Sequence, residues 1–364
     1  MRSSAPIGIA LSVLLLPSCA GTDSPGRPPD PSCDAACYDR AIRLGSDWFL
    51  NNQSEDFLHY EFYVDENRHG DDRLPLREVA TLWSVAKAAN YLDDPQLHEL
   101  ARRGLAYFES RFERDGQDGF MYLNIDAANL GYSAFVILAL LEMEHSRREE
   151  YLELFANGIL HLQEPTGRYR TYFFEDRDTD QDFFPGEACL ALMSLYDETR
   201  DARLLESVKL AFPYYAPYWR GNRTTSFIPW QTQALQRLYE VTGDDAVRDF
   251  VFEISDYMIE YHHTDEPCAG FELKGIIAGI RVEGMIRAYE LAREVGDAKR
   301  LECYGNFVRE GGDYLVDLQY TNIEKHPKPA IGGFPGRKEP KMRVDRNQHA
   351  VVALIEGREL GILK

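Results

Sequence analysis

The strongest constraint in this sequence is a repeated pattern of two helices joined by a tight turn. The segment LYDETRD at 195–201 returns as LYEVTGD at 238–244, and looser copies end at Asp297 and run through Asp94. In each copy an aspartate ends one helix-like segment and begins the next. Its carboxylate suits the N-cap, where it accepts hydrogen bonds from the free backbone N–H groups of the new helix. The interval from residue 195 to residue 238, at which the pattern returns, is typical of helical-repeat architectures.

Two kinds of predicted helix alternate along the chain. The first kind is amphipathic, and the second is apolar almost all round, as in SAFVILALLEM at 133–143. A helix of the second kind has to be covered on both sides. The amphipathic helices are expected to begin near Asp34, Asp94, Arg148, Asp201, Asp244 and Asp297. The apolar helices are expected over residues 75–91, 128–144, 185–198, 229–242, 279–295 and 345–357.

These twelve segments predict an all-α fold, an (α/α)6 toroid of six helical hairpins, over residues 33–364. The apolar helices would form the inner ring and the amphipathic helices the outer ring. An open solenoid of helix pairs is the alternative. Six hairpins suffice to close a ring and the long loops fall on one side, so the closed ring is favoured. No later stretch rich in Pro, Gly or Ser divides this region, which indicates a single domain.

The sequence also resembles a known group of proteins. The repeat, the segment FPGEACLAL at 184–192 and the late pair GGF at 332–334 and RVDRNQHAVVAL at 343–354 resemble the six-hairpin glycosidase superfamily. That group includes unsaturated-uronide hydrolases, sugar 2-epimerases, uronate-polymer lyases and the helical part of glucuronyl C5-epimerases. The resemblance covers about residues 34–358 and implies the toroid fold and a carbohydrate ligand. The paired catalytic aspartates of any one family are not matched, so the resemblance does not carry over a reaction.

The first 32 residues have the character of an export signal followed by a tether. Residues 1–18 contain one Arg and an apolar run that is too short to span a membrane, which is typical of a signal peptide. The segment LPSC at 16–19 resembles the lipobox of bacterial lipoproteins, which implies lipidation of Cys19. Residues 20–32 are rich in Pro, Ser and Gly and are expected to be a flexible tether. We therefore expect a lipoprotein of the bacterial cell envelope, in the outer membrane because Ala20 follows the cysteine; ordinary secretion is the alternative.

The net charge of the chain limits the kinds of partner that it is expected to bind. It has 40 Lys and Arg against 60 Asp and Glu, a formal net charge of −20. This excess argues against nucleic acid and against docking on anionic lipid, so contact with a membrane is expected only through the lipid anchor. After Cys19, five cysteines remain, and at least one should be free if the others pair. Cys33 and Cys37 are one helical turn apart and could pair, whereas Cys189 is expected to be a small buried hydrophobe.

Polar residues stand at the starts of the predicted inner helices, where an ordinary buried helix carries Leu or Ala. They are Arg77, Glu78, Tyr132, Ser133, Glu187, Trp230, Gln231, Arg281, Glu283, Arg343, Asp345, Gln348 and His349. In a ring whose inner helices all start at one rim, these side chains would surround a common mouth. Any one of them could instead cap a helix or form an ion pair, but as a set they predict a binding site.

Two loops support a sugar ligand at this mouth. The loop at 166–178 carries Arg168, Tyr172 and further aromatic residues. Sugar rings stack on flat aromatic side chains, and Arg binds carboxylates with two parallel hydrogen bonds. The loop at 321–343 carries six Lys and Arg against two Glu, which would suit a lid over an anionic ligand such as a uronate. A solvated loop is the alternative, and Gly332 with its neighbours fits a hinge in either case.

Metal sites are only weakly indicated, and no cofactor is expected. Acidic residues stand at five positions of a twelve-residue frame that echoes a calcium-binding loop: Asp176, Asp178, Asp180, Asp182 and Glu187. Gln181 occupies the place where such a loop needs Gly, so an acidic solvated loop is favoured over calcium binding. Zinc could also be assembled from Cys268, Cys303 and His349, but no ligand spacing supports that site.

The function favoured by the sequence is hydrolysis of glycosidic bonds in an acidic, uronate-type glycan. Such an enzyme needs two carboxylates that flank the scissile bond, one of them with a raised pKa. Glu187 and Glu283 come from different predicted inner helices and are the expected pair, with Asp345 as a third candidate. The expected substrate-binding residues are Arg77, Tyr132, Arg168, Tyr172, Trp230, Gln231, Arg281, Arg343 and Gln348.

Two other functions remain open. In a uronate lyase or a sugar epimerase, Arg281, Arg343 and Gln348 would neutralise a carboxylate while His349 or Tyr132 removes a proton from carbon. A tethered ring that only binds glycan, without catalysis, is the second alternative. Substitution of Glu187 would abolish turnover while sparing affinity only if the protein is an enzyme.

Overall fold

The computed structural model describes residues 33–117, 119–177, 179–263, 268–273, 277–336 and 340–364. The predicted signal peptide, the lipidated Cys19 and the tether therefore lie outside the described residues. Residues Cys33–Lys364 form one compact unit. Its described part contains twelve α-helices and five short β-strands. None of the described helices is both long and apolar enough to span a bilayer.

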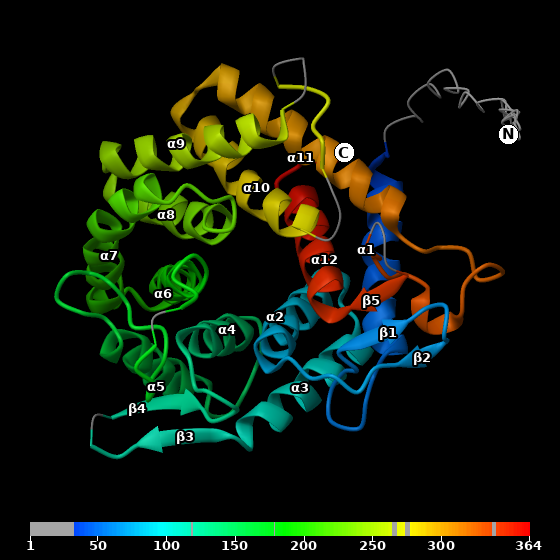
Figure 1. Ribbon diagram of the computed structural model, residues 1–364, viewed down its shortest axis with the longest axis horizontal. Coiled ribbons are helices and arrows are strands. Elements are labelled where there is room, and N and C mark those ends of the chain that lie inside the picture. The colour runs from blue at the N-terminus through cyan, green and yellow to red at the C-terminus, as the bar shows by residue number, and fades with distance from the viewer. Residues whose placement is uncertain (1–32, 118, 178, 264–267, 274–276, 337–339) are drawn as a thin grey trace, which may run out of the picture. The chain divides into compact units, whose positions relative to one another are not determined.

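Six helices form a closed inner ring (Figure 1). Each inner helix packs on the next, and the last, α12, packs back on the first, α2. The inner helices are α2 (Pro75–Leu92), α4 (Leu130–Leu141), α6 (Phe184–Thr199), α8 (Ile228–Thr242), α10 (Ala278–Val295) and α12 (Val344–Glu359). The contact between α12 and α2 confirms the predicted (α/α)6 toroid and rules out the open solenoid.

Six further helices cover the outside of this ring (Figure 1). They are α1 (Ala35–Asn51), α3 (Pro95–Glu109), α5 (Arg148–His161), α7 (Ala202–Gly221), α9 (Asp245–His262) and α11 (Ala298–Leu318). Five of them begin at a predicted aspartate whose side chain accepts backbone N–H groups: Asp34, Asp94, Asp201, Asp244 and Asp297. The sixth, α5, begins at Arg148 without a side-chain cap. The repeat in the sequence is thus one hairpin of an outer and an inner helix.

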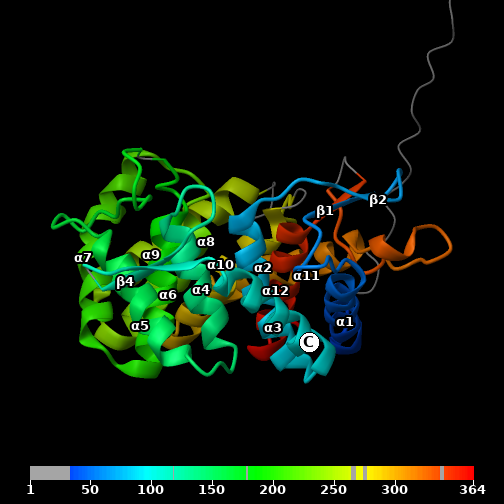
Figure 2. The same cartoon turned by 90° about the horizontal axis from the view of Figure 1, so that it is seen from below.

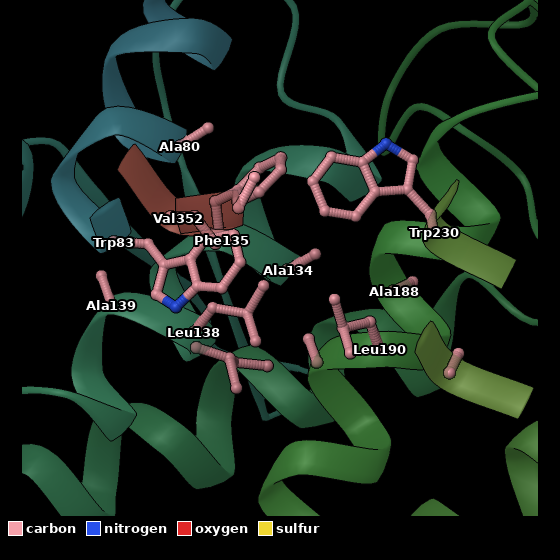
Figure 3. Close-up of a cluster of buried hydrophobic side chains, with 14 of the residues drawn as sticks. Ala80, Trp83, Ala134, Phe135, Leu138, Ala139, Ala188, Leu190, Trp230 and Val352 are labelled. Atoms are coloured by element: carbon pink, nitrogen blue, oxygen red, sulfur yellow. The ribbon is translucent and has the colours of Figure 1, made fainter. Parts of the chain in front are cut away.

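Aromatic side chains fill the middle of the ring. Figure 3 shows Trp83 of α2, Phe135 of α4 and Trp230 of α8 directed into the space between the inner helices. The ring centroids of Trp83 and Phe135 are 6.3 Å apart, and those of Phe135 and Trp230 are 5.5 Å apart. One cavity includes Phe135 and Trp230 in its lining and another includes Trp83. The aromatic cluster therefore separates the two ends of the ring.

At the C-terminal ends of the inner helices, each helix contributes a charged residue to the second cavity. These residues are Lys87, Glu142, Asp197, Arg237, Arg287 and Glu356. The carboxylate of Glu356 is 3.3 Å from the ammonium of Lys87 and 3.0 Å from the guanidinium of Arg287. Glu356 is the buried counter-ion that both cations share, while Glu290 lies 2.9 Å from Arg287 and Glu142 lies 3.9 Å from Lys87. Ion pairs therefore join α12 to α2 and to α10 at this end.

One small sheet of short strands lies beyond the opposite end of the helices (Figure 2). Strand β1 (Glu61–Tyr63) pairs with β2 (Arg68–His69) and with β5 (Lys341–Arg343), both antiparallel. A second hairpin, β3 (Phe112–Asp115) and β4 (Phe120–Leu123), packs on α5. Because β5 leads directly into α12, its pairing with β1 holds Arg343 at the start of that inner helix.

Residues 321–336 of the predicted basic lid do not line the cavity that contains Phe135 and Trp230, whereas Arg343 at the end of that loop does. Residues 328–334 pack on α1, where Asn52 donates a hydrogen bond to the carbonyl of Pro329 at 2.8 Å. Gly332 has a φ of +84° and lies so close to Leu44 that a Cβ would be 1.9 Å from its carbonyl oxygen. This glycine permits tight packing against α1, so it is not a free hinge. Residues 337–339 of the predicted lid lie outside the described residues. Strand β5 comes after them in the sequence and leads into the inner helix α12.

Two disulfides connect the outer helices to neighbouring segments. Cys33 pairs with Cys37, as predicted, and Cys268 pairs with Cys303. Cys189 is buried and unpaired, also as predicted. The disulfide between Cys268 and Cys303 rules out the alternative in which those two thiolates bind zinc with His349.

Candidate active site

A cavity of about 590 Å³ opens at the N-terminal ends of the inner helices. Eight of the predicted site residues line it: Arg77, Tyr172, Glu187, Trp230, Arg343, Asp345, Gln348 and His349. They come from α2, α6, α8, α12, strand β5 and the loop before α6. The ring thus brings together residues that are far apart in the sequence, because every inner helix starts at the same end.

Glu187 lies in the first turn of α6, which begins at Phe184 and Pro185. Proline is favoured there because its missing N–H would have no partner in the first turn. Glu187 is only 5% exposed, and its Oε2 has no hydrogen-bond partner among the described residues. Burial, with a contribution from the charge of Asp180, raises the pKa of Glu187 to about 8. A carboxyl group that stays protonated at neutral pH and borders a cavity can act as a general acid.

The space for this carboxyl group comes from Gly131 in the adjacent helix α4. A Cβ at Gly131 would lie 2.7 Å from Oε2 of Glu187, so any side chain there would force the carboxyl group to move. The position of Glu187 therefore depends on a glycine 56 residues earlier in the chain.

His349 and Glu283 form a hydrogen-bonded pair between α12 and α10. Nδ1 of His349 is 2.9 Å from Oε1 of Glu283, and the His349 ring lies 5.8 Å from that of Trp230. Burial raises the pKa of Glu283 to about 6, although the nearby imidazole opposes that shift. Burial alone would lower the pKa of His349, but the Glu283 carboxylate outweighs it and raises the pKa. His349 borders the cavity and Glu283 does not. The structure therefore places Glu283, a predicted catalytic carboxylate, behind the imidazole, where it can orient His349.

Asp345 lies between two guanidinium groups at the opposite side of the ring from α6. Its Oδ2 is 2.7 Å from Arg77, and Nε of Arg343 donates to its Oδ1 at 2.9 Å. Arg77 also donates to the hydroxyl of Tyr60 at 3.0 Å. Deeper in α12, the side-chain oxygen of Gln348 accepts a hydrogen bond from Thr81 at 3.0 Å. Asp345 is thus neutralised on both sides, which makes it a weaker candidate for a nucleophile than the sequence suggested.

Other residues line the cavity that the sequence analysis did not select, among them Asp180, Phe183, Asn129 and Arg346. The hydroxyl of Tyr172 donates to Oδ2 of Asp180 at 2.8 Å. Asp180 belongs to the acidic run before α6, for which the sequence raised only calcium binding. Its proximity in sequence to the start of an inner helix was the signal that could have identified it.

The fold of this chain is similar to the folds of several solved structures. A structure of D-mannose isomerase is similar over 92% of this chain and 100% of that chain, with 14% identity and a TM-score of 0.66. Cellobiose 2-epimerase from Bacillus thermoamylovorans is similar over 89% and 98%, with 14% identity and a TM-score of 0.66. An inactive variant of a family 76 alpha-1,6-mannanase from Salegentibacter, in complex with alpha-1,6-mannotetrose, is similar over 89% and 99%, with 13% identity and a TM-score of 0.64.

The chain is a six-hairpin (α/α)6 toroid. These similarities cover nearly the whole of each solved chain, and they confirm the predicted fold and the predicted resemblance to six-hairpin proteins. Identities of 13–14% show the fold alone. No protein-family model matches the sequence, and no curated protein sequence matches it.

Four predicted binding residues of the toroid do not line the cavity. Tyr132 is buried within α4, and burial raises its pKa, which also argues against its predicted role as a base. Gln231 is buried between α8 and α6, near Gly186. Arg168 binds Glu164 at 2.9 Å in the loop that follows α5.

The fourth is Arg281, near the start of α10. It donates to Nε2 of His262 at 2.6 Å and to the hydroxyl of Thr225 at 3.1 Å, and it is buried away from the cavity. Its first-turn position was predicted correctly, but its side chain points toward α9. The sequence places a residue in a helical turn, whereas the rotation of the helix decides which way that residue points.

The described acidic residues of the 176–187 frame, for which calcium binding was the less favoured alternative, do not converge on one point. Glu187 faces the cavity, Asp182 accepts a hydrogen bond from Tyr218 at 3.1 Å, and Asp180 accepts hydrogen bonds from Tyr172 and Thr179. Asp178 lies outside the described residues. Over the described ranges, no group of three or more His, Cys, Asp or Glu side chains is arranged to hold a metal ion.

Proposed function

We propose that this toroid is a carbohydrate-active enzyme that hydrolyses glycosidic bonds in an acidic, uronate-type glycan. The observation that carries this proposal is Glu187, a buried carboxyl group with a raised pKa at the wall of an open cavity. Protonation of the leaving oxygen is the step for which glycosidases use such a group. The carboxylate of Asp345 and the imidazole of His349 lie across the ring, on α12, and are the candidates to activate water.

Three features support an anionic sugar as the ligand. The positive ends of six inner-helix dipoles meet around the cavity, which favours negative charge there. Arg77 and Arg343 stand at its edge, and the guanidinium group suits the geometry of a carboxylate. The side chain of Arg77 is 42% exposed, so a ligand can approach it from solvent.

The similar solved structures support the broader class of ligand. They include an isomerase of D-mannose, an epimerase of cellobiose and a mannanase bound to a mannose oligosaccharide. All three names describe proteins that act on or bind sugars. A sugar ligand in the corresponding toroid of this chain agrees with the aromatic residues Trp230 and Phe184 in its cavity wall.

A second candidate function, a sugar epimerase or uronate lyase, is favoured by one specific observation. Glu283 binds Nδ1 of His349 and leaves Nε2, the other ring nitrogen, for a substrate. An imidazole held in this way can take a proton from a carbon atom next to a carbonyl or carboxylate group. Glu187 could then return a proton from another wall of the cavity.

The products distinguish these functions. The full-length chain is incubated with uronate-containing and neutral oligosaccharides, and new reducing ends, ultraviolet absorbance and sugar isomers are measured. A hydrolase yields reducing ends without new absorbance, and Glu187→Gln removes that activity. The exposed substitution Glu302→Gln is the matched control and should leave it unchanged. New ultraviolet absorbance would indicate a lyase, and new sugar isomers would indicate an epimerase. Binding of a sugar without any product would indicate that the protein binds glycan without catalysis.

We further propose that the protein is exported and anchored in the bacterial outer membrane through lipid on Cys19. The two disulfides support an oxidising compartment, because such bonds are rare in the cytosol. Cys19→Ala is expected to release the protein from the membrane fraction and to abolish labelling with a radioactive fatty acid. Labelling that persists in this variant would refute the anchor.

A further inference from the structure

The two sides of the cavity mouth differ in chemistry. Three consecutive inner helices, α6, α8 and α10, carry apolar side chains at or just before their starts: Phe183, Trp230 and Ile277. The next two helices, α12 and α2, start with Arg343, Asp345 and Arg77. We call the first set the apolar arc and the second set the charged arc. Glu187 lies in α6, at one end of the apolar arc.

The apolar arc is unusual because part of it faces solvent. Phe183 is 39% exposed and Ile277 is 44% exposed, whereas Trp230 is 2% exposed. Exposed apolar side chains that border a pocket mark a binding surface more often than isolated ones do. Beside Phe183, Asp180 receives its two hydrogen bonds at Oδ2, from Tyr172 and Thr179. Its Oδ1 accepts none from the described residues, and is available to a ligand hydroxyl group.

The charged arc suits an anionic group of a ligand. Asp345 already bridges Arg77 and Arg343, yet a second anion can bind the outer N–H groups of these guanidiniums, since each has five. A neutral sugar would leave those outer N–H groups without an anionic ligand. A carboxylate on the apolar arc would face Phe183 and Ile277, and among the described residues no cation lines that part of the cavity. The two arcs therefore suit two different sugar units.

We propose that the substrate is a mixed glycan in which a uronate adjoins a neutral sugar, the uronate binding at the charged arc and the neutral sugar stacking on the apolar arc. This inference rests on the proposed function, in which Glu187 protonates the oxygen between two such units. Phe183 contacts the face of the neutral sugar, and Asp180 accepts one of its hydroxyl groups. A glycan composed only of uronates would place a carboxylate against the apolar arc and should bind less well.

The test measures binding and hydrolysis separately. The Glu187→Gln variant, which keeps the cavity but cannot donate the proton, is titrated calorimetrically with mixed, all-uronate and all-neutral oligosaccharides of equal length. The mixed series is expected to bind about tenfold more tightly than either of the others, the size of effect that one aromatic contact or one charge pair produces. Equal affinity for the mixed and all-uronate series would overturn the inference.

A matched pair of variants locates the neutral sugar. Adding Phe183→Ala to Glu187→Gln should weaken binding of the mixed series by about tenfold and leave the all-uronate series nearly unchanged. Phe174 is 63% exposed but does not border the cavity, so Phe174→Ala is the control and should change neither. An equal effect of both substitutions would also overturn the inference. Hydrolysis of the mixed series by the unsubstituted chain is measured separately. If the mixed series binds most tightly but is not hydrolysed, the proposed reaction fails while the inference about the substrate stands.

Discussion

The raised pKa of Glu187 predicts a cost in stability that a single substitution should remove. The carboxyl group has its usual pKa of 4.5 in the unfolded chain and a pKa of about 8 in the folded protein. Between these values the folded state binds more protons than the unfolded state, so the free energy of unfolding falls as pH rises through this window. At about 1.36 kcal/mol per pKa unit, the loss is about 3 kcal/mol at pH 7 and about 5 kcal/mol above pH 8.

Glu187→Gln removes the ionisable group while keeping its shape. Urea unfolding of the variant and of the unsubstituted chain is measured from about pH 5 to pH 8.5, with Glu302→Gln as an exposed control. The stability of the variant relative to the unsubstituted chain is expected to rise by about 4 kcal/mol over this range. Other titrating groups, including Glu283, occur in both proteins and cancel in the comparison. Parallel stability curves would refute the reasoning, because they would mean that Glu187 ionises as readily in the folded chain as in the unfolded one.

Two further predictions concern the packing around the ring. Glu356→Gln removes the buried counter-ion that Lys87 and Arg287 share, while Glu142 and Glu290 remain near them, and it is expected to destabilise the protein by about 1.5–3 kcal/mol in urea unfolding at neutral pH. Burial alone would raise the pKa of Glu356, but the nearby cations outweigh it and lower the pKa. The stabilisation is therefore present at neutral pH and should be lost as pH falls through that lowered value; a destabilisation by the substitution of less than about 1 kcal/mol would show that these ion pairs are solvated. Gly131→Ala puts a Cβ 2.7 Å from Oε2 of Glu187, so we expect at least a tenfold loss of turnover, as from a misplaced catalytic group, with a folded circular-dichroism spectrum. Unchanged turnover would show that Glu187 does not need this space.

Much of the fold could be predicted from the sequence because its determinants are local. Five aspartates cap the outer helices as expected, since a cap needs only the N–H groups of the following turn. The apolar runs of the inner helices were recognisable because these helices are covered on both sides. The short strands were missed, and β5 shows why: it has three residues and exists only because β1, far earlier in the chain, pairs with it.

The candidate site was predicted only in part. The sequence correctly indicated that polar residues at inner-helix starts gather at one end, and seven of them line the cavity together with Tyr172 of the preceding loop. It failed where the rotation of a helix decides the outcome. Arg281 and Glu283 lie in neighbouring positions of α10, yet the first points toward His262 and the second toward His349.

The sequence alone determined that helical hairpins repeat, where each outer helix begins and which inner-helix starts are polar, because caps and periodicity act within a few residues of one chain segment. Only the tertiary structure decided which of these polar groups meet. Arg77 neutralises Asp345 across 268 residues of sequence, and Gly131 of one helix makes room for Glu187 of the next. Such contacts depend on how helices pack side by side when the ring closes, and no local pattern records that packing.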